Sequence, residues 1–150
     1  EGGFYAETYR SAGTIPHSVL PKEYRGDRAF STAILFLLRQ GEYSHLHRIR
    51  QDEIWHFHMG GPLRLVSLSP EGEARETLLG TDLARGQQVQ SVVRGGCWFG
   101  ATPAPGVDFA LVGCTVAPGF DFADFEMGER HQLEQTFPAA HTLVREFTTK

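Results

Sequence analysis

Short stretches of alternating apolar and polar residues recur up to about residue 120, separated by turns rich in Gly and Pro. Alternation with a period of two places the apolar side chains on one face of a strand, where a core can bury them. Many short strands of this kind are typical of an all-β sandwich or barrel. The pattern predicts strands over Ser31–Leu38, Tyr43–Ile49, Glu53–His58, Leu63–Leu68, Ala74–Leu79, Gln88–Val93, Trp98–Thr102 and Asp108–Val116.

The C-terminal part of the chain has apolar residues at helical spacing instead. Leu133 and Phe137 are four residues apart, as are Leu143 and Phe147, so each pair lies on one face of a helix. Pro138 separates the two stretches and suits the first turn of the second. We therefore expect a single domain over residues 1–150, with strands to about residue 120 and a short helical tail over about residues 128–147.

The composition narrows the classes of function. The longest uncharged apolar stretch, Ala33–Leu38, is far shorter than the roughly 20 residues of a membrane-spanning helix, so no membrane partner is expected. The net charge of −4 offers no basic surface for a phosphate backbone, which argues against a nucleic-acid partner. Two cysteines, Cys97 and Cys114, are too few for a disulfide framework, and we expect no secretory signal. We expect a cytoplasmic protein with Cys114 in its core.

Histidines gather in the second and third of these predicted strands, where four of the seven lie between positions 45 and 58. His45 and His47 are two residues apart, so they share one face of a strand, whereas alternation places Glu53 and His56 on opposite faces of the next strand. If the two strands form a hairpin, a His-His-Glu or a four-histidine cluster converges, depending on register. Such a cluster can hold Fe, Mn, Ni, Cu or Zn, or act without metal in acid–base chemistry. The spacing alone is equally compatible with a polar outer face.

This part of the chain resembles the first motif of the cupin superfamily, G-x5-H-x-H-x3–4-E-x6-G. His45-Leu46-His47, Glu53 and Gly60 follow the motif, but five residues separate His47 from Glu53 and only three separate Gly41 from His45. At the place of the second motif, G-x5-P-x-G-x2-H-x3-N, the chain has Val93-Arg94-Gly95-Gly96-Cys97-Trp98. Gly95 matches, whereas Trp98 stands where the metal-binding His of the motif is usual.

A narrower resemblance covers nearly the whole chain and is to the cupin-5 family of small uncharacterised proteins. Five blocks carry it in matching order: Glu1–Ser11, Ser44–Arg48, Asp52–His58, Gly96–Gly100 and Val112–Asp121. The resemblance implies a jelly-roll β-barrel, usually paired as a homodimer, with a small-molecule pocket inside the barrel. It implies no assigned reaction.

The departures from the motifs leave two interpretations of the chemistry. A metal site would keep at most His45, His47 and Glu53, and two histidines with one carboxylate can hold Fe(II) with open positions. His56 joins this set only if a bulge turns it inward. The metal-free interpretation, which we favour over a divalent metal cofactor, resembles the sugar-nucleotide epimerases of the superfamily. By this similarity His47 is the general base, and Glu53 or another carboxylate fixes its tautomer.

The proton donor in the metal-free interpretation is one of two tyrosines, with an arginine to lower its pKa: Tyr9 or Tyr43, with Arg10 or Arg48. The N-terminal strand pattern adds Glu7 as a site candidate, although this strand can also be a dimer edge with no chemistry. The predicted catalytic residues are His47, Glu53, His56 and Tyr9. The predicted ligand contacts are Glu7, Arg10, Tyr43, His45, Arg48, Trp55 and Trp98, of which the tryptophans can equally fill the core.

Three functions follow from these residues. The first is metal-independent epimerisation or isomerisation of a carbohydrate-like substrate, the second is a metal-dependent cupin oxygenase-type reaction, and the third is ligand binding or storage without turnover. Fold alone does not choose among them, because one fold hosts many chemistries.

Overall fold

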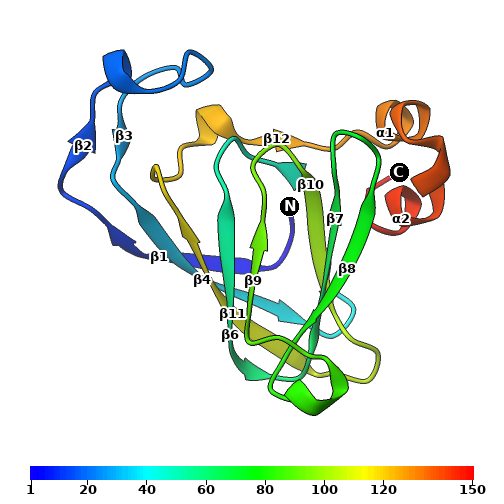
Figure 1. The fold of residues 1–150 in the computed structure, drawn as a ribbon. Helices are drawn as coiled ribbons and strands as arrows, with labels where there is room; N and C mark the ends of the chain where they lie inside the picture. Colours follow the sequence, from blue (N-terminus) through cyan, green and yellow to red (C-terminus); the bar gives the residue numbers. More distant parts are fainter.

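Two five-stranded antiparallel sheets form most of the molecule in the computed structural model, which describes residues 1–150 (Figure 1). One sheet has, in order, β1 (Phe4–Arg10), β4 (Thr32–Arg39), β11 (Phe109–Val116), β6 (Glu53–Gly60) and β9 (Gln90–Val93). The other has β12 (Glu126–Met127), β5 (Ser44–Arg48), β10 (Trp98–Pro103), β7 (Leu63–Leu68) and β8 (Ala74–Leu79). Smaller elements are β2 (Thr14–Ile15), β3 (Arg28–Ala29), and the 3-10 helices η1 (His17–Val19), η2 (Leu83–Arg85) and η3 (Phe122–Asp124).

The chain moves from one sheet to the other between β5 and β6. These two strands therefore do not form the hairpin that the sequence allowed. β5 pairs with β10 and β12, whereas β6 pairs with β11 and β9. Side chains of the two strands can meet only across the space between the sheets. This is where the polar residues of the site lie.

The main core fills the space between the two sheets. It contains fourteen buried residues, and Trp55 of β6 is 1% exposed between Phe36 and Phe99, whose rings meet it edge-on at centroid distances of 6.1 and 6.2 Å. Each apolar side chain of this size contributes roughly 1.5–3 kcal/mol when it is buried. One end of the space is left unfilled and forms the pocket described below.

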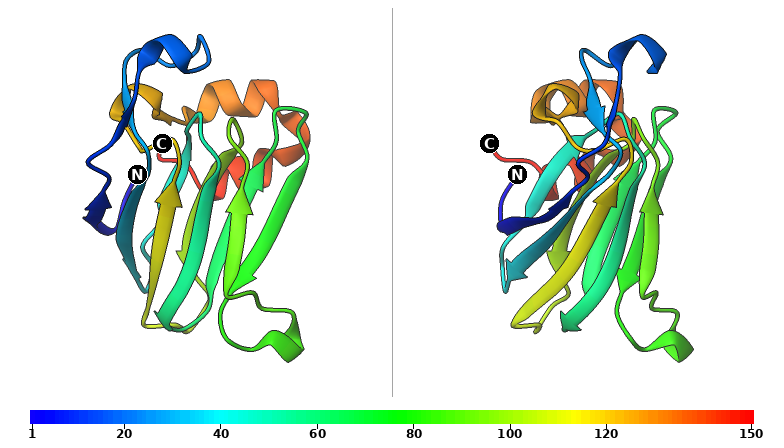
Figure 2. Two further views of the ribbon diagram at one scale, coloured as in Figure 1. Left: turned by 60° about the vertical axis from the view of Figure 1, so that its left-hand side comes forward. Right: turned by 90° about the vertical axis from the view of Figure 1, so that its left-hand side faces the viewer.

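The helical tail covers the outer face of the sheet that contains β5, β10 and β7 (orange and red in Figure 2). It consists of α1 (Arg130–Thr136), the 3-10 helix η4 (Pro138–Ala140) and α2 (His141–Glu146). A second core of nine buried residues lies beneath it, and this core includes Leu46, Trp98, Leu133 and Phe147. The predicted all-β fold with a short helical C-terminal appendage is confirmed. No helix is long and apolar enough to cross a membrane.

The segment of residues 117–127, here called the strap, connects β11 to β12 and lies over one end of the barrel. A buried ion pair fixes it: Arg28 donates two hydrogen bonds of 2.8 and 2.9 Å to Asp124, and these side chains are only 3% and 1% exposed. Gln51 donates a further bond of 2.8 Å to Asp124. Thr32 accepts a bond of 2.9 Å from the backbone N–H of Phe120. The strap is thus held to both sheets.

Candidate functional site

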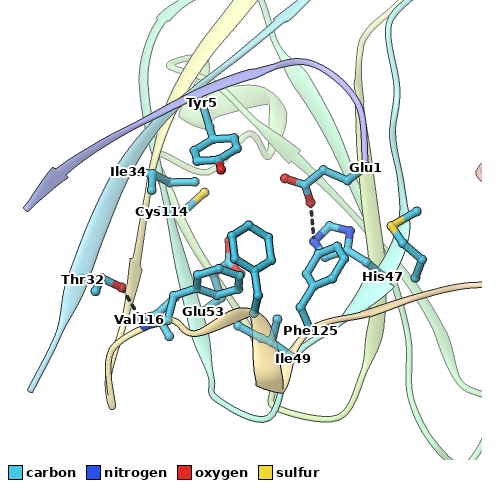
Figure 3. A pocket seen from close by; sticks show the side chains of 13 residues that line it. Glu1, Tyr5, Thr32, Ile34, His47, Ile49, Glu53, Cys114, Val116 and Phe125 are labelled. Atoms are coloured by element: carbon cyan, nitrogen blue, oxygen red, sulfur yellow. Dashed lines mark hydrogen bonds and ion pairs between the residues drawn. The ribbon is translucent and has the colours of Figure 1, made fainter. Parts of the chain in front are cut away.

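A cavity of about 220 Å³ opens between the two sheets beneath the strap (Figure 3). Its deep end contains Glu53 and Cys114, which are buried, and its rim contains Tyr5 and Phe122, which are 58% and 67% exposed. Nine of the thirteen lining residues are hydrophobic. The full lining is Glu1, Tyr5, Thr32, Ile34, His47, Ile49, Glu53, Cys114, Val116, Phe120, Phe122, Phe125 and Met127.

His47 projects into this cavity from β5 with both of its ring nitrogens engaged. Nε2 lies 2.9 Å from a carboxylate oxygen of Glu1, and Nδ1 lies 2.7 Å from the carbonyl oxygen of His45. Both partners accept hydrogen bonds, so the imidazole fits best as the doubly protonated cation. Its ring also packs against Phe99 and Phe125 at centroid distances of 4.2 and 5.3 Å.

Glu1 and His47 stabilise each other's charged forms. Burial alone lowers the pKa of His47, but the hydrogen bond and the negative charge of Glu1 outweigh this effect, so the pKa of the imidazole is raised. Burial likewise raises the pKa of Glu1, but the hydrogen bond and the charge of His47 outweigh it, so the pKa of that carboxyl is lowered. The two groups form an ion pair of no net charge inside the pocket.

Glu53 is the titratable group at the bottom of the pocket. Burial among apolar side chains raises its pKa from 4.5 to about 7, although the positive charge of His47 and a hydrogen bond from the Cys114 thiol act in the opposite direction. In turn, burial and the nearby Glu53 carboxylate raise the pKa of Cys114 well above its ordinary value, so that thiol stays protonated. A carboxyl with a pKa near neutrality both accepts and donates protons under physiological conditions.

The strap supplies the aromatic wall of the pocket. Phe120, Phe122 and Phe125 meet one another edge-on, with centroid distances of 5.0, 6.3 and 6.0 Å. The strap follows β11 in the chain. The side chains that close the pocket are therefore far from the histidines in the sequence. No arginine or lysine is among the lining residues.

A β-bulge separates the two histidines that alternation had placed on one face. Ser44 pairs with Ala101 and His47 with Phe99, so two residues of β5, His45 and Leu46, lie opposite the single residue between those partners. His45 is not a lining residue; its Nδ1 lies 2.8 Å from the carbonyl oxygen of Glu1. The prediction that both histidines share a face is wrong because sequence alternation does not reveal the bulge.

A second bulge changes the N-terminal strand. Glu7 pairs with Ile34 but Tyr9 pairs with Ala33, so the extra residue at Thr8 turns Tyr9 to the face opposite the one that bears Ile34 and the pocket. Tyr9 is 55% exposed and is not a lining residue. The tyrosine that does reach the pocket is Tyr5 (Figure 3).

Glu7 and Arg10 lie beside the pocket rim without lining it. Arg10 donates a 2.6 Å bond to Glu7 and a 3.2 Å bond to the carbonyl oxygen of Phe120 in the strap. Both side chains are exposed, at 45% and 42%. They can contact only a ligand that extends beyond the cavity.

His56 and Trp55 of β6 lie outside the pocket. His56 is on the opposite face from Glu53, as alternation predicted, and its ring nitrogens lie 2.9 Å from the Thr115 hydroxyl and 3.2 Å from the Gln90 amide. Trp55 is a core residue. No bulge turns His56 inward, so it does not join a cluster with Glu53.

The three remaining predicted ligand contacts lie on the helical side of the sheet or at its edge. Trp98 belongs to the second core, with the Arg48 guanidinium 4.5 Å from its ring centroid, and Tyr43 packs edge-on against Phe147 at 5.3 Å. The inward residue of β10 is Phe99, next to Trp98, and it occupies the space beside His47. Trp98 aligns with a metal-binding histidine of the motif, but in this structure it lies on the face of β10 that points away from the pocket.

The side chains do not fit a divalent metal. A ligating imidazole needs a free ring nitrogen, but both nitrogens of His47 are engaged, and His45 does not line the cavity. The structure has no group of three His, Cys, Asp or Glu side chains arranged to hold a metal ion. The predicted set of His45, His47 and Glu53 does not converge, and we derive no step through a metal.

The sequence predicted His47 and Glu53 as site residues, and both line the pocket, but it did not predict several of the other lining residues. Glu1 and Tyr5 lie in the N-terminal block that carries the family resemblance, but the candidates predicted there were Glu7, Tyr9 and Arg10. Cys114 was expected in the core and is buried there, yet it also lines the pocket. Phe120 lies in the block Val112–Asp121 that carries the family resemblance, whereas Phe122 and Phe125 lie outside every block.

Two antiparallel sheets with a pocket between them, a histidine from one and a carboxylate from the other, define a cupin-type barrel. The chain belongs to the family Cupin_5, Cupin superfamily (DUF985), which matches residues 1–128. A hypothetical protein from Leishmania major is similar over 100% of this chain and 91% of its own, with 32% identity and a TM-score of 0.91. A protein from Shewanella oneidensis is similar over 98% of this chain and 87% of its own, with 40% identity and a TM-score of 0.87.

More distant structures share the fold alone. A cupin 2 domain-containing protein from Halorhodospira halophila covers 99% of this chain and 84% of its own, with 12% identity and a TM-score of 0.62. The search of curated proteins found no match. The comparisons confirm the family and the fold, so the function has to be argued from the pocket.

Proposed function

We propose that this protein is a metal-independent proton-transfer enzyme, an isomerase or epimerase of a small carbonyl compound, with Glu53 as the acid–base group. One observation carries the proposal: Glu53 is a buried carboxyl at the end of an apolar pocket, with its pKa raised to about 7. Strongly shifted carboxyls in closed pockets are characteristic of catalytic acids and bases.

In the proposed reaction the Glu53 carboxylate accepts a proton from the carbon next to a carbonyl group. The C–H bond breaks, its electron pair forms the double bond of an enolate, and the carbonyl oxygen takes the negative charge. The protonated carboxyl then returns the proton to carbon, which restores the carbonyl compound or its isomer. The positive charge of His47 acts on Glu53 itself: it favours the ionised carboxylate and opposes part of the effect of burial, which keeps both protonation states of Glu53 accessible near neutral pH.

This assignment differs from the sequence-based prediction, in which His47 is the base. An imidazole that donates both N–H groups has no lone pair with which to accept a proton. If His47 lost its Nε2 proton, the Nε2 lone pair would face a carboxylate oxygen of Glu1 at 2.9 Å with no hydrogen between them, which is repulsive. The environment therefore favours a positioned cation at His47 and a proton-exchanging carboxyl at Glu53.

Hydrogen exchange at carbon tests the proposal. The protein is incubated in deuterated buffer with a panel of ketones, hydroxy acids, sugars and sugar nucleotides, and loss of the proton signal next to the carbonyl is followed by NMR. The wild type is expected to exchange at least one compound, Glu53→Gln to lose about a hundredfold or more of that rate, and Glu71→Gln, at an exposed position in a turn, to retain it. Saturable binding without exchange would support a non-catalytic binding module and contradict the proposal.

The homodimer implied by the family resemblance is a further part of the proposed function. Its support is that β1 is an edge strand of its sheet and has exposed residues throughout its length. Light scattering on the purified chain would give twice the mass of the monomer if the proposal holds, and the monomer mass would contradict it.

A further inference from the structure

We propose, building on the proton-transfer function, that the ligand is a small, uncharged and mostly apolar carbonyl compound of about ten non-hydrogen atoms, and that sugars, sugar nucleotides and carboxylates are excluded. This differs from the carbohydrate-like substrate predicted from sequence. The inference rests on the volume, the charges and the hydrogen-bonding capacity of the pocket.

The volume limits the size of the ligand. An apolar protein cavity of roughly 150 Å³ is sufficient for a benzene molecule. The cavity here has about 220 Å³, so by the same packing it accommodates about nine or ten non-hydrogen atoms. Pockets for larger, drug-sized ligands start at roughly 300 Å³. A sugar nucleotide is several times too large to lie inside.

The charges in the pocket argue against ions. The only positive side chain in the lining is His47, which Glu1 neutralises at 2.9 Å, and no arginine or lysine is present to receive a carboxylate or phosphate. An anion would also lie close to Glu53. The apolar walls that hold Glu53 protonated up to about pH 7 would disfavour a ligand ion of either sign for the same reason, namely loss of hydration.

Three arginines outside the pocket do not change this balance. Arg10, beside the rim, is compensated by Glu7 at 2.6 Å. Arg48 and Arg50 lie in a neighbouring polar hollow that shares only Ile49 and Phe125 with the pocket. Arg48 is bound to Glu126 at 2.7 Å, and Arg50 lies 3.6 Å from Asp124. Both charges are compensated on the far side of the wall.

The pocket also has too few hydrogen-bonding groups for a sugar. Apart from Glu53 and the Tyr5 hydroxyl at the rim, its polar side chains are already occupied: Glu1 and His47 bind each other, and the Thr32 hydroxyl binds the backbone of Phe120. A buried hydroxyl without a partner costs about 1–3 kcal/mol, and a hexose has several. One carbonyl oxygen, in contrast, needs a single donor, which Glu53 provides when it is protonated; the ionised form of Glu53 is the one that accepts the carbon-bound proton in the proposed reaction.

The arrangement of the lining gives the orientation of the ligand. Glu53 and Cys114 are at the buried end, whereas the rings of Phe120, Phe122 and Phe125 lie toward the strap and the rim. The carbonyl end of the ligand enters first and reaches Glu53. The apolar remainder then packs against the phenylalanine rings, where stacked or edge-on aromatic contacts are favourable.

Isosteric probes of different charge test this inference. Propiophenone, phenylacetate and 2-phenylethylammonium each have about ten non-hydrogen atoms and one ring, and they differ chiefly in charge. Calorimetric titration at pH 6, where most Glu53 side chains keep their proton, is expected to give an affinity for propiophenone at least about tenfold higher than for either ion or for glucose. Equal or tighter binding of an ion or of glucose, or no binding of propiophenone at millimolar concentration, overturns the inference.

Two variants on one strand show whether the probe occupies this pocket. Ile34 lines the cavity from β4, whereas Leu35, the next residue, points to the other face and is 39% exposed. Ile34→Trp fills the cavity and is expected to weaken propiophenone binding by at least about tenfold, while Leu35→Trp leaves it unchanged. Circular dichroism establishes that both variants are folded. Equal affinity in the wild type and Ile34→Trp would overturn the assignment to this pocket.

The same proteins and probes distinguish a failure of the proton-transfer function from a failure of the proposed ligand class. Binding of propiophenone without hydrogen exchange in deuterated buffer supports the ligand class and contradicts the proton-transfer function. Glu53-dependent exchange on a sugar or a carboxylate, with no binding of propiophenone, supports proton transfer and contradicts the ligand class.

Discussion

Replacing Glu53 with glutamine is expected to remove a large part of the pH dependence of stability. Raising the pKa of a carboxyl from 4.5 to about 7 disfavours its ionised form by about 3 kcal/mol, because each tenfold change in proton affinity corresponds to about 1.4 kcal/mol. Glutamine has nearly the same shape as the protonated side chain but does not ionise. The variant therefore avoids the cost that the wild type meets when Glu53 loses its proton.

The sign follows from proton binding. Between pH 4.5 and about 7 the folded chain holds the Glu53 proton and the unfolded chain has released it, so the free energy of unfolding falls as pH rises through this window. The stabilisation is fully present below pH 4.5 and is lost above about pH 7. Between pH 5 and pH 8 the contribution of Glu53 to this loss is about 2–3 kcal/mol in the wild type and is absent in Glu53→Gln.

Urea unfolding at the two pH values, with wild type and variant side by side, measures this difference. The contribution of His47 is largely common to both proteins and cancels in the comparison. Glu71→Gln, at an exposed position in a turn, is the matched control and should follow the wild type. If the free energies of unfolding of wild type and Glu53→Gln run parallel between pH 5 and pH 8, the reasoning about the buried carboxyl is wrong.

Three further predictions follow from the same geometry. Glu1→Gln should lower the pKa of His47, because the hydrogen bond and charge of Glu1 no longer oppose the effect of burial, and an unchanged imidazole titration by NMR would contradict this. Arg28→Met should cost about 3 kcal/mol of unfolding free energy, because buried Asp124 then keeps only the Gln51 amide and the partly exposed Arg50, 3.6 Å away. Adding Asp124→Leu should recover much of this loss, and a loss below about 1 kcal/mol would refute the clamp. Cys114→Ala should raise the pKa of the pocket carboxyl in a pH–rate profile, with Cys114→Ser closer to wild type, because the thiol donates to the ionised form.

The alternation of apolar residues predicted most of the fold. The strands at Leu63–Leu68 and Ala74–Leu79 have the predicted bounds, because each is bordered by turn residues and has one buried face. The helical tail was predicted for the same kind of reason, since Leu133 and Phe137 are both buried against the sheet. These features depend on local periodicity, which the sequence contains.

The site depended on features without local periodicity. One bulge moves His45 out of the pocket and another turns Tyr9 away from it, and each reverses a side chain that strict alternation had assigned. The separation of β5 and β6 into different sheets likewise arises from pairing with β10 and β11, which are distant in the sequence. His47 and Glu53 were identified because a resemblance located them, whereas the roles of Glu1 and the strap depend on tertiary contacts.

The ionisation of Glu53 is the central claim, and a carbon-13 NMR titration of its side-chain carboxyl tests it most directly. Selective labelling with comparison against Glu53→Gln assigns the signal. The account predicts a midpoint near 7, with the signal displaced when a neutral carbonyl ligand occupies the pocket. A midpoint near 4.5, the ordinary value for a glutamate, would show that the pocket does not hold this proton and would contradict the proposed chemistry.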